Sequence, residues 1–328
     1  MSSNHANRRE GVRRALLVVA LLAVVLLPVV GIRVLGKDEP EAVSATGDVT
    51  LGAGNRMVYV VEGHVAAVSL NDNGISSPRP PVVSDLLCAR VYAARGTGVC
   101  LRQTTPLSWS ATVLDRNLEA TSTWPVAGEP VLARVSPSGR MVVWTALTKG
   151  TSLSGSFTAV TSVVDTTRRE EIKDLSTFTA RVGADREVTK KYQIWGVTFR
   201  DDDAFLATVS AGRRRYLAQG RLSTRELTTI APDVTNPAVS PDGTQVAFVR
   251  VSGEGRTGRL AVMDLRTRRV HHVGEQRGVT DQPVWFDDKT VGYVVRDAAG
   301  HSTIWSTGLG AGARPDLVLA NAISPSPL

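Results

Sequence analysis

The stretch that decides the fold is Val239-Ser240-Pro241-Asp242-Gly243-Thr244-Gln245-Val246-Ala247-Phe248-Val249. It joins the apolar end of one segment to a second segment of β-branched and aromatic residues through a tight turn. Proline presets φ at the first central turn position, aspartate bonds back to the local backbone, and glycine adopts the left-handed conformation. The stretch therefore predicts a β-hairpin.

The same arrangement recurs along the chain. A good copy spans 135–144, weaker copies span 285–293 and 198–206, and a degenerate copy spans 89–101. Each unit continues into a second pair of short strands, clearest at 259–267 and 270–273. Four short strands recurring every ~40 to 50 residues are typical of propeller blades. The longer interval before Arg200 predicts an insertion near 174–191.

The two ends of the repeat region complement each other. Residues 321–326 resemble the first strand and turn of a further unit, which then stops, whereas 56–70 resemble later strands without a first one. We expect Ile323–Ser326 to complete the blade begun at Met57, because ring closure removes exposed strand edges. No helical periodicity separates the strands, which disfavours a parallel α/β sheet. The predicted fold is all-β: a six-bladed β-propeller with a single N-terminal transmembrane helix.

These motifs resemble a known family. Ser-Pro-Asp-Gly followed by Val-Ala-Phe, and then Val-Met-Asp-Leu at 262–265, is similar to the repeat of TolB-type six-bladed propellers. The resemblance covers roughly residues 55–328 and implies a noncatalytic envelope protein that binds other proteins. Similar repeats also occur in propellers attached to serine peptidases. The chain lacks the separate N-terminal α/β domain of the TolB type and carries an apolar segment instead.

That apolar segment predicts membrane attachment. Residues 15–32 form an uncharged apolar run preceded by four arginines, and at 1.5 Å per residue a helix of this length covers about 27 Å. We expect a cytoplasmic basic tail at 1–14, a transmembrane helix or signal anchor at 15–36, a linker at 37–54 and the propeller at 55–328, on the extracytoplasmic side. The alternative is a cleaved signal peptide ending at Val43-Ser44-Ala45, which would give a secreted protein.

The net charge of +7 lies mainly in the N-terminal segment. Residues 1–37 contain six basic side chains and one acidic one, a balance of +5, which leaves 7 − 5 = +2 for the rest. A domain so close to neutrality lacks the positive field that drives phosphate binding, so we expect no nucleic-acid partner.

The two cysteines, Cys88 and Cys100, flank a turn-like Arg95-Gly96-Thr97-Gly98. If the flanking segments pair as a hairpin, the two fall nearly opposite each other, and a disulfide is feasible in an oxidising compartment. The alternative is two small apolar residues on a buried strand pair. Neither cysteine has the spacing of a metal or redox site.

We found no catalytic, cofactor or metal-binding constellation in the sequence. The repeated turn residues are interpreted as structural: Pro137, Gly139, Pro241, Asp242, Gly243, Asp287 and Asp288. His271 and His272 point to opposite faces of a predicted strand, which argues against joint metal ligation. No G-x-S-x-G elbow is present. The arginine clusters at 213–215 and 266–269 are interpreted as solvated edges, and the six tryptophans as blade packing.

Two functional hypotheses follow. The first is a membrane-anchored, noncatalytic scaffold, without cofactor and monomeric, that binds another envelope or secreted protein through its loops or its axial funnel. The second is a propeller-type hydrolase or lyase acting on an envelope or extracellular substrate. The second requires carboxylates and histidines that converge at the axial mouth, whereas a polar funnel without them favours binding.

Overall fold

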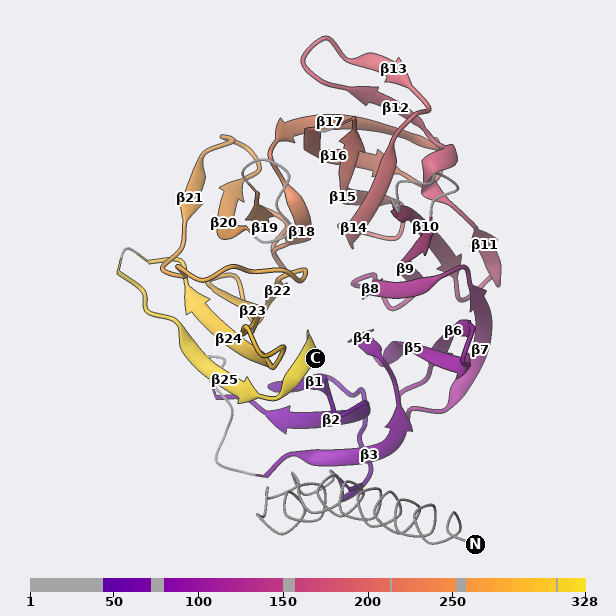
Figure 1. Cartoon of the computed structure of the whole chain (residues 1–328), viewed down its shortest axis with the longest axis vertical. Coiled ribbons are helices and arrows are strands. Elements are labelled where there is room, and N and C mark those ends of the chain that lie inside the picture. Colours follow the sequence, from indigo (N-terminus) through magenta and orange to yellow (C-terminus); the bar gives the residue numbers. More distant parts are fainter. Residues whose placement is uncertain (1–43, 72–79, 150–156, 213, 252–257, 311) are drawn as a thin grey trace, which may run out of the picture. The chain divides into compact units, whose positions relative to one another are not determined.

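The computed structural model describes residues 44–71, 80–149, 157–212, 214–251, 258–310 and 312–328. These residues form six β-sheets arranged as blades around one axis (Figure 1). In every blade the strands follow one another from the axis outward, with the first strand of the unit innermost. The six-bladed all-β propeller predicted from the repeat is confirmed.

The first three blades are four-stranded. In order from the axis, the first blade holds β26 (Ala322–Pro327), β1 (Arg56–Val61), β2 (His64–Ser69) and β3 (Val82–Leu87). The second blade holds β4 (Arg90–Ala94), β5 (Thr97–Thr105), β6 (Ser108–Leu114) and β7 (Ala120–Val126). The third blade holds β8 (Glu129–Val135), β9 (Met141–Lys149), β10 (Phe157–Asp165) and β11 (Glu170–Ile172).

The remaining blades repeat the pattern. The fourth blade holds β14 (Gln193–Phe199), β15 (Ala204–Ala211), β16 (Arg214–Arg221) and β17 (Glu226–Pro232). The fifth blade holds β18 (Thr235–Val239), β19 (Gln245–Arg250), β20 (Arg259–Asp264) and β21 (Val270–His272). The sixth blade holds β22 (Val284–Trp285), β23 (Thr290–Arg296), β24 (Ser302–Gly308) and β25 (Asp316–Ala320).

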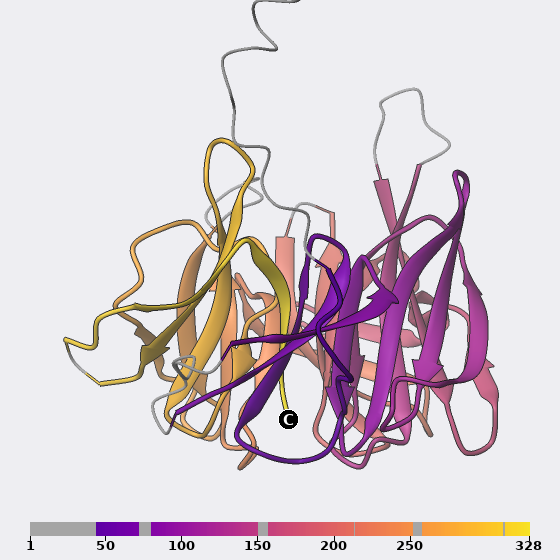
Figure 2. The ribbon, with the colours of Figure 1, turned by 90° about the horizontal axis from the view of Figure 1, so that it is seen from below.

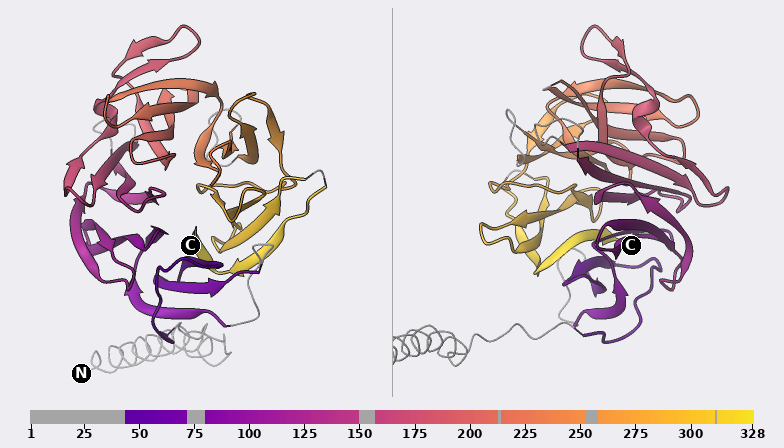
Figure 3. Two further views of the ribbon diagram at one scale, coloured as in Figure 1. Left: turned by 180° about the vertical axis from the view of Figure 1, so that it is seen from behind. Right: turned by 45° about the vertical axis from the view of Figure 1, so that its right-hand side comes forward.

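The fourth blade carries an insertion, in the interval where the sequence predicts one. A short 3₁₀ helix, η1 (Leu175–Thr177), leads into β12 (Thr179–Val182) and β13 (Glu187–Thr189). β12 pairs in parallel with the outer strand β17, so the sheet extends to six strands. The hairpin extends beyond the rim of this blade, as seen from behind (Figure 3). Tyr192 anchors the insertion, because its hydroxyl donates to the carbonyls of Leu175 and Phe178.

The C-terminal strand closes the ring. β26 pairs antiparallel with β1, with Met57 opposite Pro327 and Val61 opposite Ala322, and the C-terminus lies beside β1 near the axis (Figures 1 and 2). One detail differs from the expectation. Residues 324–326 do not form a turn but continue the strand, because the serine hydroxyls bond to the backbone of the neighbouring blade.

The core lies between adjacent blades. Apolar side chains of one sheet face those of the next, as where Val99 and Leu101 of β5 share a buried cluster with Val142 and Trp144 of β9. This stacking explains the β-branched and aromatic composition of the middle strands. Buried apolar surface between the blades, rather than across one central core, stabilises the ring.

The chain packs on the propeller before the predicted boundary at residue 55. Val49 and Leu51 are buried in a cluster shared by the first two blades, and the N–H of Leu51 donates to the carbonyl of Arg116 at 2.8 Å. The predicted tail at 1–14, the membrane segment at 15–36 and the start of the linker lie outside the described residues. Among the residues that are described, no helix has the length and hydrophobicity needed to cross a membrane.

Candidate functional site: the axial funnel

The repeated turns lie together on one face of the ring, which we call the turn face. It carries the links from each innermost strand to the next, including residues 136–140, 200–203, 240–244 and 286–289. Gly139 and Gly243 have φ of 84° and 71°, and each donates its N–H to the carbonyl of the serine three residues earlier at 2.9 Å. These glycines occupy the left-handed turn position for which the sequence selects them.

The acidic turn residues join neighbouring blades. Asp202 accepts hydrogen bonds from the hydroxyls of Ser136 and Ser138 at 2.7 and 2.5 Å. Asp288 accepts one from the N–H of Asp242 at 2.9 Å. In each case a carboxylate of one blade caps the turn of the preceding blade. Pro137, Pro241 and Asp287 lie in the same turns, and Asp287 accepts the N–H of Lys289 at 2.6 Å.

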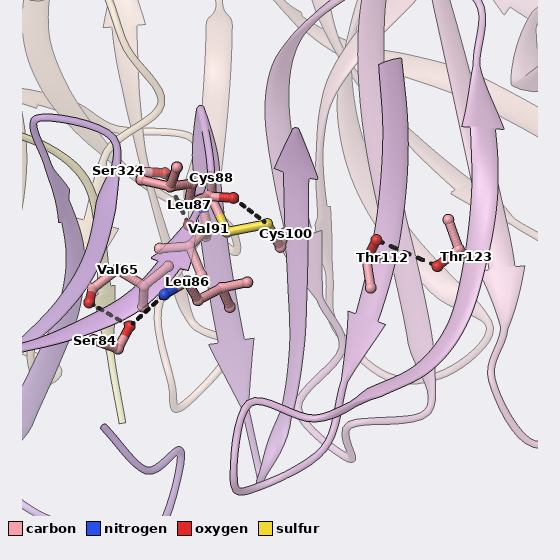
Figure 4. The surroundings of a disulfide bond; sticks show 10 residues. All are labelled: Val65, Ser84, Leu86, Leu87, Cys88, Val91, Cys100, Thr112, Thr123 and Ser324. Atoms are coloured by element: carbon pink, nitrogen blue, oxygen red, sulfur yellow. Dashed lines mark hydrogen bonds between the residues drawn. A yellow bond between two sulfur atoms is a disulfide. The ribbon is translucent and has the colours of Figure 1, made fainter. Parts of the chain in front are cut away.

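Cys88 and Cys100 form a disulfide (Figure 4). Cys88 lies in the link between the first two blades, immediately before β4, and Cys100 lies on β5. The N–H of Cys88 donates to the carbonyl of Gly63, which ties the same link to the first blade. The bond thus fixes the chain where it enters the second blade.

A funnel of about 300 Å³ opens on the turn face along the axis. Its wall is built from the ends of five innermost strands and the turns that follow them. The side chains that give it chemical character are Tyr92, Arg95, Arg134, Arg200 and Trp285. Three arginines therefore converge from the second, third and fourth blades, although they are far apart in the sequence.

Arg134 forms the base of the funnel. Its residue is 9% exposed, and its guanidinium donates to the carbonyls of Ala133, Gln282 and Pro283 at 2.9, 3.3 and 2.8 Å. The guanidinium lies 4.4 Å from the centroid of the Tyr92 ring, a cation–π contact. Burial lowers the pKa of Arg134, while Tyr92 and Asp281 oppose that shift.

Gln282 fills the axis beside Arg134. Its side chain is buried, and Nε2 donates to the carbonyls of Gly196, Val197 and Pro237 at 3.2, 3.2 and 2.5 Å. These three carbonyls belong to the fourth and fifth blades, so a single amide connects them to the segment before β22. Arg134 and Gln282 are thus linked to each other and to the fourth and fifth blades.

The segment 273–283, which delivers Gln282 to the axis, is held by a buried carboxylate. Glu275 accepts from the Tyr293 hydroxyl at 2.6 Å and from Arg277 Nε at 2.8 Å, and Arg277 stacks on the Trp305 ring at 3.7 Å. Burial would raise the pKa of Glu275, but hydrogen bonds from Arg277 and Tyr293 outweigh it and lower the pKa. The carboxylate is therefore charged and fully bonded.

On the far side of Arg134, Arg90 and Asp281 form an ion pair between β4 and the segment 273–283. Arg90, Asp281, Arg134 and Ser324 surround a small cavity there of about 10 Å³. The cavity is too small for a ligand. Asp281 is therefore paired with Arg90 and does not line the funnel.

The funnel wall, in the described structure, contains no Asp, Glu or His. The carboxylates and histidines that the enzymatic hypothesis would require at this mouth are therefore absent from its described lining. His271 and His272 are exposed on β21 at the outer edge of the fifth blade. His64 bonds to the carbonyl of Ser84 and His301 to Asp297. Among the described residues, no group of three or more His, Cys, Asp or Glu side chains could hold a metal ion.

A larger hollow lies away from the axis. It measures about 700 Å³ and lies between the inserted hairpin β12–β13 and the strands β15–β17. Its lining alternates in charge, with Asp185, Arg186, Glu187 and Arg214. Because charges of opposite sign alternate there, the groove carries no field of one sign, whereas the charged side chains of the funnel are all positive, and we take the funnel as the candidate site.

The fold and the funnel define a six-bladed β-propeller with an arginine-lined axial mouth. The chain is similar in structure to TolB from Acinetobacter baumannii, with a TM-score of 0.57 at 15% identity over 86% of this chain and 67% of that one. A TolB structure from Agrobacterium tumefaciens matches with a TM-score of 0.49 at 12% identity, over 83% and 92% of the two chains. The chain is a TolB-like six-bladed propeller in fold.

An oligogalacturonate lyase solved in complex with manganese matches with a TM-score of 0.47 at 13% identity, over 78% of this chain and 74% of that one. No protein-family model matches the chain, and no curated protein does. At these identities the likeness concerns the fold alone.

The sequence did not reveal the funnel residues. Arg95 is visible only as part of a degenerate turn, and Gln282 belongs to no motif. One sequence signal marks two arginines near the axis. Arg90 and Arg134 are the central residues of matching Ala-Arg-Val tripeptides in two repeats. Both tripeptides lie at innermost strands, where side chains reach the axis.

Proposed function

We propose that the protein is a noncatalytic scaffold that holds another envelope or secreted protein through the axial funnel of its propeller. The observation that supports this most is the funnel wall, which combines three arginines with aromatic and small apolar residues and, in its described part, has no carboxylate or imidazole. General acid–base chemistry needs groups that titrate near the working pH, and arginine does not.

We further propose that residues 15–36 anchor the chain in a membrane, with the propeller on the extracytoplasmic side. The arginine-flanked apolar run supports this, and so does the disulfide, which persists in oxidising compartments. Extraction of membranes with alkaline carbonate tests the anchor. We expect the full chain to stay with the membrane pellet and to be digested by protease added outside; release into the supernatant would indicate a cleaved signal instead.

Site-specific photo-crosslinking in intact cells tests the scaffold function. Pro137 is exposed and lines the funnel, whereas Thr224 is exposed in the link between β16 and β17 and lies outside the funnel lining. A photoreactive residue at 137 should capture one protein reproducibly, and the same residue at 224 should not. Equal capture from both positions, or capture from neither, would contradict the proposal.

A further inference from the structure

We infer that the funnel recognises carboxylates, and that its ligand is an acidic peptide segment of the partner protein. This inference rests on the proposed binding function and names the chemistry of the partner. It is supported by the charge, burial and lack of ion pairs of Arg95, Arg134 and Arg200, together with the apolar funnel wall between them.

The two rim arginines are free to bind. Arg95 and Arg200 are exposed, and neither has a carboxylate within 4 Å among the described residues. They follow β4 and β14, on blades that lie on either side of the third blade. The turns of this face also carry acidic residues such as Asp202, Asp242 and Asp288, but none of them lines the funnel. The charged side chains that do line it are all positive, so they reinforce one another and attract an anion.

Arg134 adds a buried positive charge at the base. It has no carboxylate within ion-pair distance, and its three hydrogen bonds go to neutral carbonyls. These bonds involve Nη1 and Nη2, and a guanidinium has five N–H donors, so Arg134 keeps donor capacity beyond its three carbonyl contacts. Asp281 acts on Arg134 only at longer range and is itself paired with Arg90, so the burial of this cation is incompletely compensated and unfavourable. An anion that enters the funnel would offset that penalty.

The walls favour a peptide over a sugar acid. Sugars bind by stacking on open aromatic faces, but the Tyr92 ring is covered by Arg134, and Trp285 is 7% exposed with its N–H bonded to the carbonyl of Ala238. The remaining wall is small and apolar, with Ala94, Ala238 and Pro283. A volume of about 300 Å³ accommodates a few residues of extended chain rather than a folded surface.

The test measures binding of a fluorescent hexaglutamate peptide, amidated at its C-terminus, to the full chain in detergent. Its controls are a hexaglutamine amide, a hexaglutamine with a free C-terminal carboxylate, and trigalacturonate as competitor. We expect the hexaglutamate to bind and the hexaglutamine amide to bind at least tenfold more weakly. Binding of the free-carboxylate hexaglutamine alone would assign the site to a chain terminus instead of acidic side chains.

Charge-matched variants locate the site. Arg95→Gln combined with Arg200→Gln should weaken hexaglutamate binding by about tenfold or more, which corresponds to about 1.4 kcal/mol. Arg266→Gln combined with Arg269→Gln removes the same two charges from the adjacent link between β20 and β21, whose residue Leu265 bonds to Thr244, and should change the affinity by less than about twofold. Arg134 is kept, because it also positions Gln282 and Pro283.

Besides binding of the free-carboxylate hexaglutamine alone, three outcomes would overturn the inference: equal affinity for glutamate and glutamine peptides, equal weakening by the paired Arg266→Gln and Arg269→Gln replacements, or binding of trigalacturonate alone. The result also separates this inference from the proposed function. If a partner is captured at position 137 while acidic peptides are not preferred, the scaffold function stands and the ligand chemistry is wrong. If acidic peptides bind but no protein is captured, the carboxylate recognition stands and the scaffold function is wrong.

Discussion

The hydroxyl of Ser326 is bonded twice to Ala93 of the neighbouring blade. It accepts the N–H of Ala93 at 2.8 Å and donates to the carbonyl of Ala93 at 3.1 Å. Ser324 makes the same pair of contacts with Val91 at 3.1 and 2.8 Å. β26 is thus joined to β1 by backbone bonds and to β4 by hydroxyls, and ring closure involves two blades instead of one.

Replacement of the inner serine should destabilise the propeller. Ser326 is fully buried, and Ser326→Ala leaves the N–H and carbonyl of Ala93 without their partner. An unsatisfied buried backbone group costs about 1–3 kcal/mol, so we expect a loss of that size in the free energy of unfolding, measured with urea. Thr224→Ala, at an exposed hydroxyl, should change it by less than about 0.5 kcal/mol. Equal losses in the free energy of unfolding for Ser326→Ala and Thr224→Ala would contradict the role assigned to Ser326.

Removal of residues 321–328 should have a larger effect. It deletes β26, exposes the edge of β1 and leaves the cluster around Met57 without Ala322. A melting temperature falls by about 2–4 °C per kcal/mol in domains somewhat smaller than this one, so a drop of ~10 °C or more is expected in thermal melts. A synthetic peptide of residues 321–328, added to the truncated protein, should restore part of the lost melting temperature. An unchanged transition would contradict the closure.

Loss of the disulfide should also lower stability. The bond closes a loop between residues 88 and 100, and in the chain-entropy model a loop of this size is worth about 3 kcal/mol. Cys100→Ser, or reduction of the natural protein, should lower the free energy of unfolding by about 2–4 kcal/mol. Reductant added to Cys100→Ser should have no further effect; a further loss would show that the reductant acts elsewhere.

The buried Glu275 predicts a pH dependence. Its pKa is lowered in the folded protein from the ordinary 4.5, so its stabilising contribution is present above about pH 4.5 and is lost as the pH falls through the folded pKa. Glu275→Gln should therefore lower the free energy of unfolding by about 1–3 kcal/mol at pH 7. The difference from the natural protein should shrink in urea titrations between pH 5 and pH 3.

The control for this prediction is Glu226→Gln. Glu226 is 55% exposed and lies 3.8 Å from Arg181, and an exposed pair of this kind contributes less than about 1 kcal/mol. Its replacement should have a small effect. A difference at Glu275 that stays constant from pH 7 to pH 3 would contradict the role assigned to its charge.

Repeats made the fold predictable, whereas the site depends on residues that repeats do not mark. The turn at 240–243 and the incomplete units at the two ends identify both the blade and its closure, since each is a local pattern. Arg95, Arg134 and Arg200 meet only because five blades converge on an axis, and no spacing along the chain records that convergence. Gln282 reaches the axis on an irregular segment, which has no periodicity to detect.

The central claim is that the arginine-lined funnel is where a partner protein binds. It is tested most directly by repeating the capture from position 137 with Arg95→Gln and Arg200→Gln present. The control carries Arg266→Gln and Arg269→Gln, which remove the same number of charges, in the same background.

We predict that the partner captured from position 137 is lost, or reduced by about tenfold, when Arg95 and Arg200 are both replaced, and is retained when Arg266 and Arg269 are both replaced. Capture that is unchanged by the double replacement, in a protein whose melting temperature is also unchanged, would contradict the account.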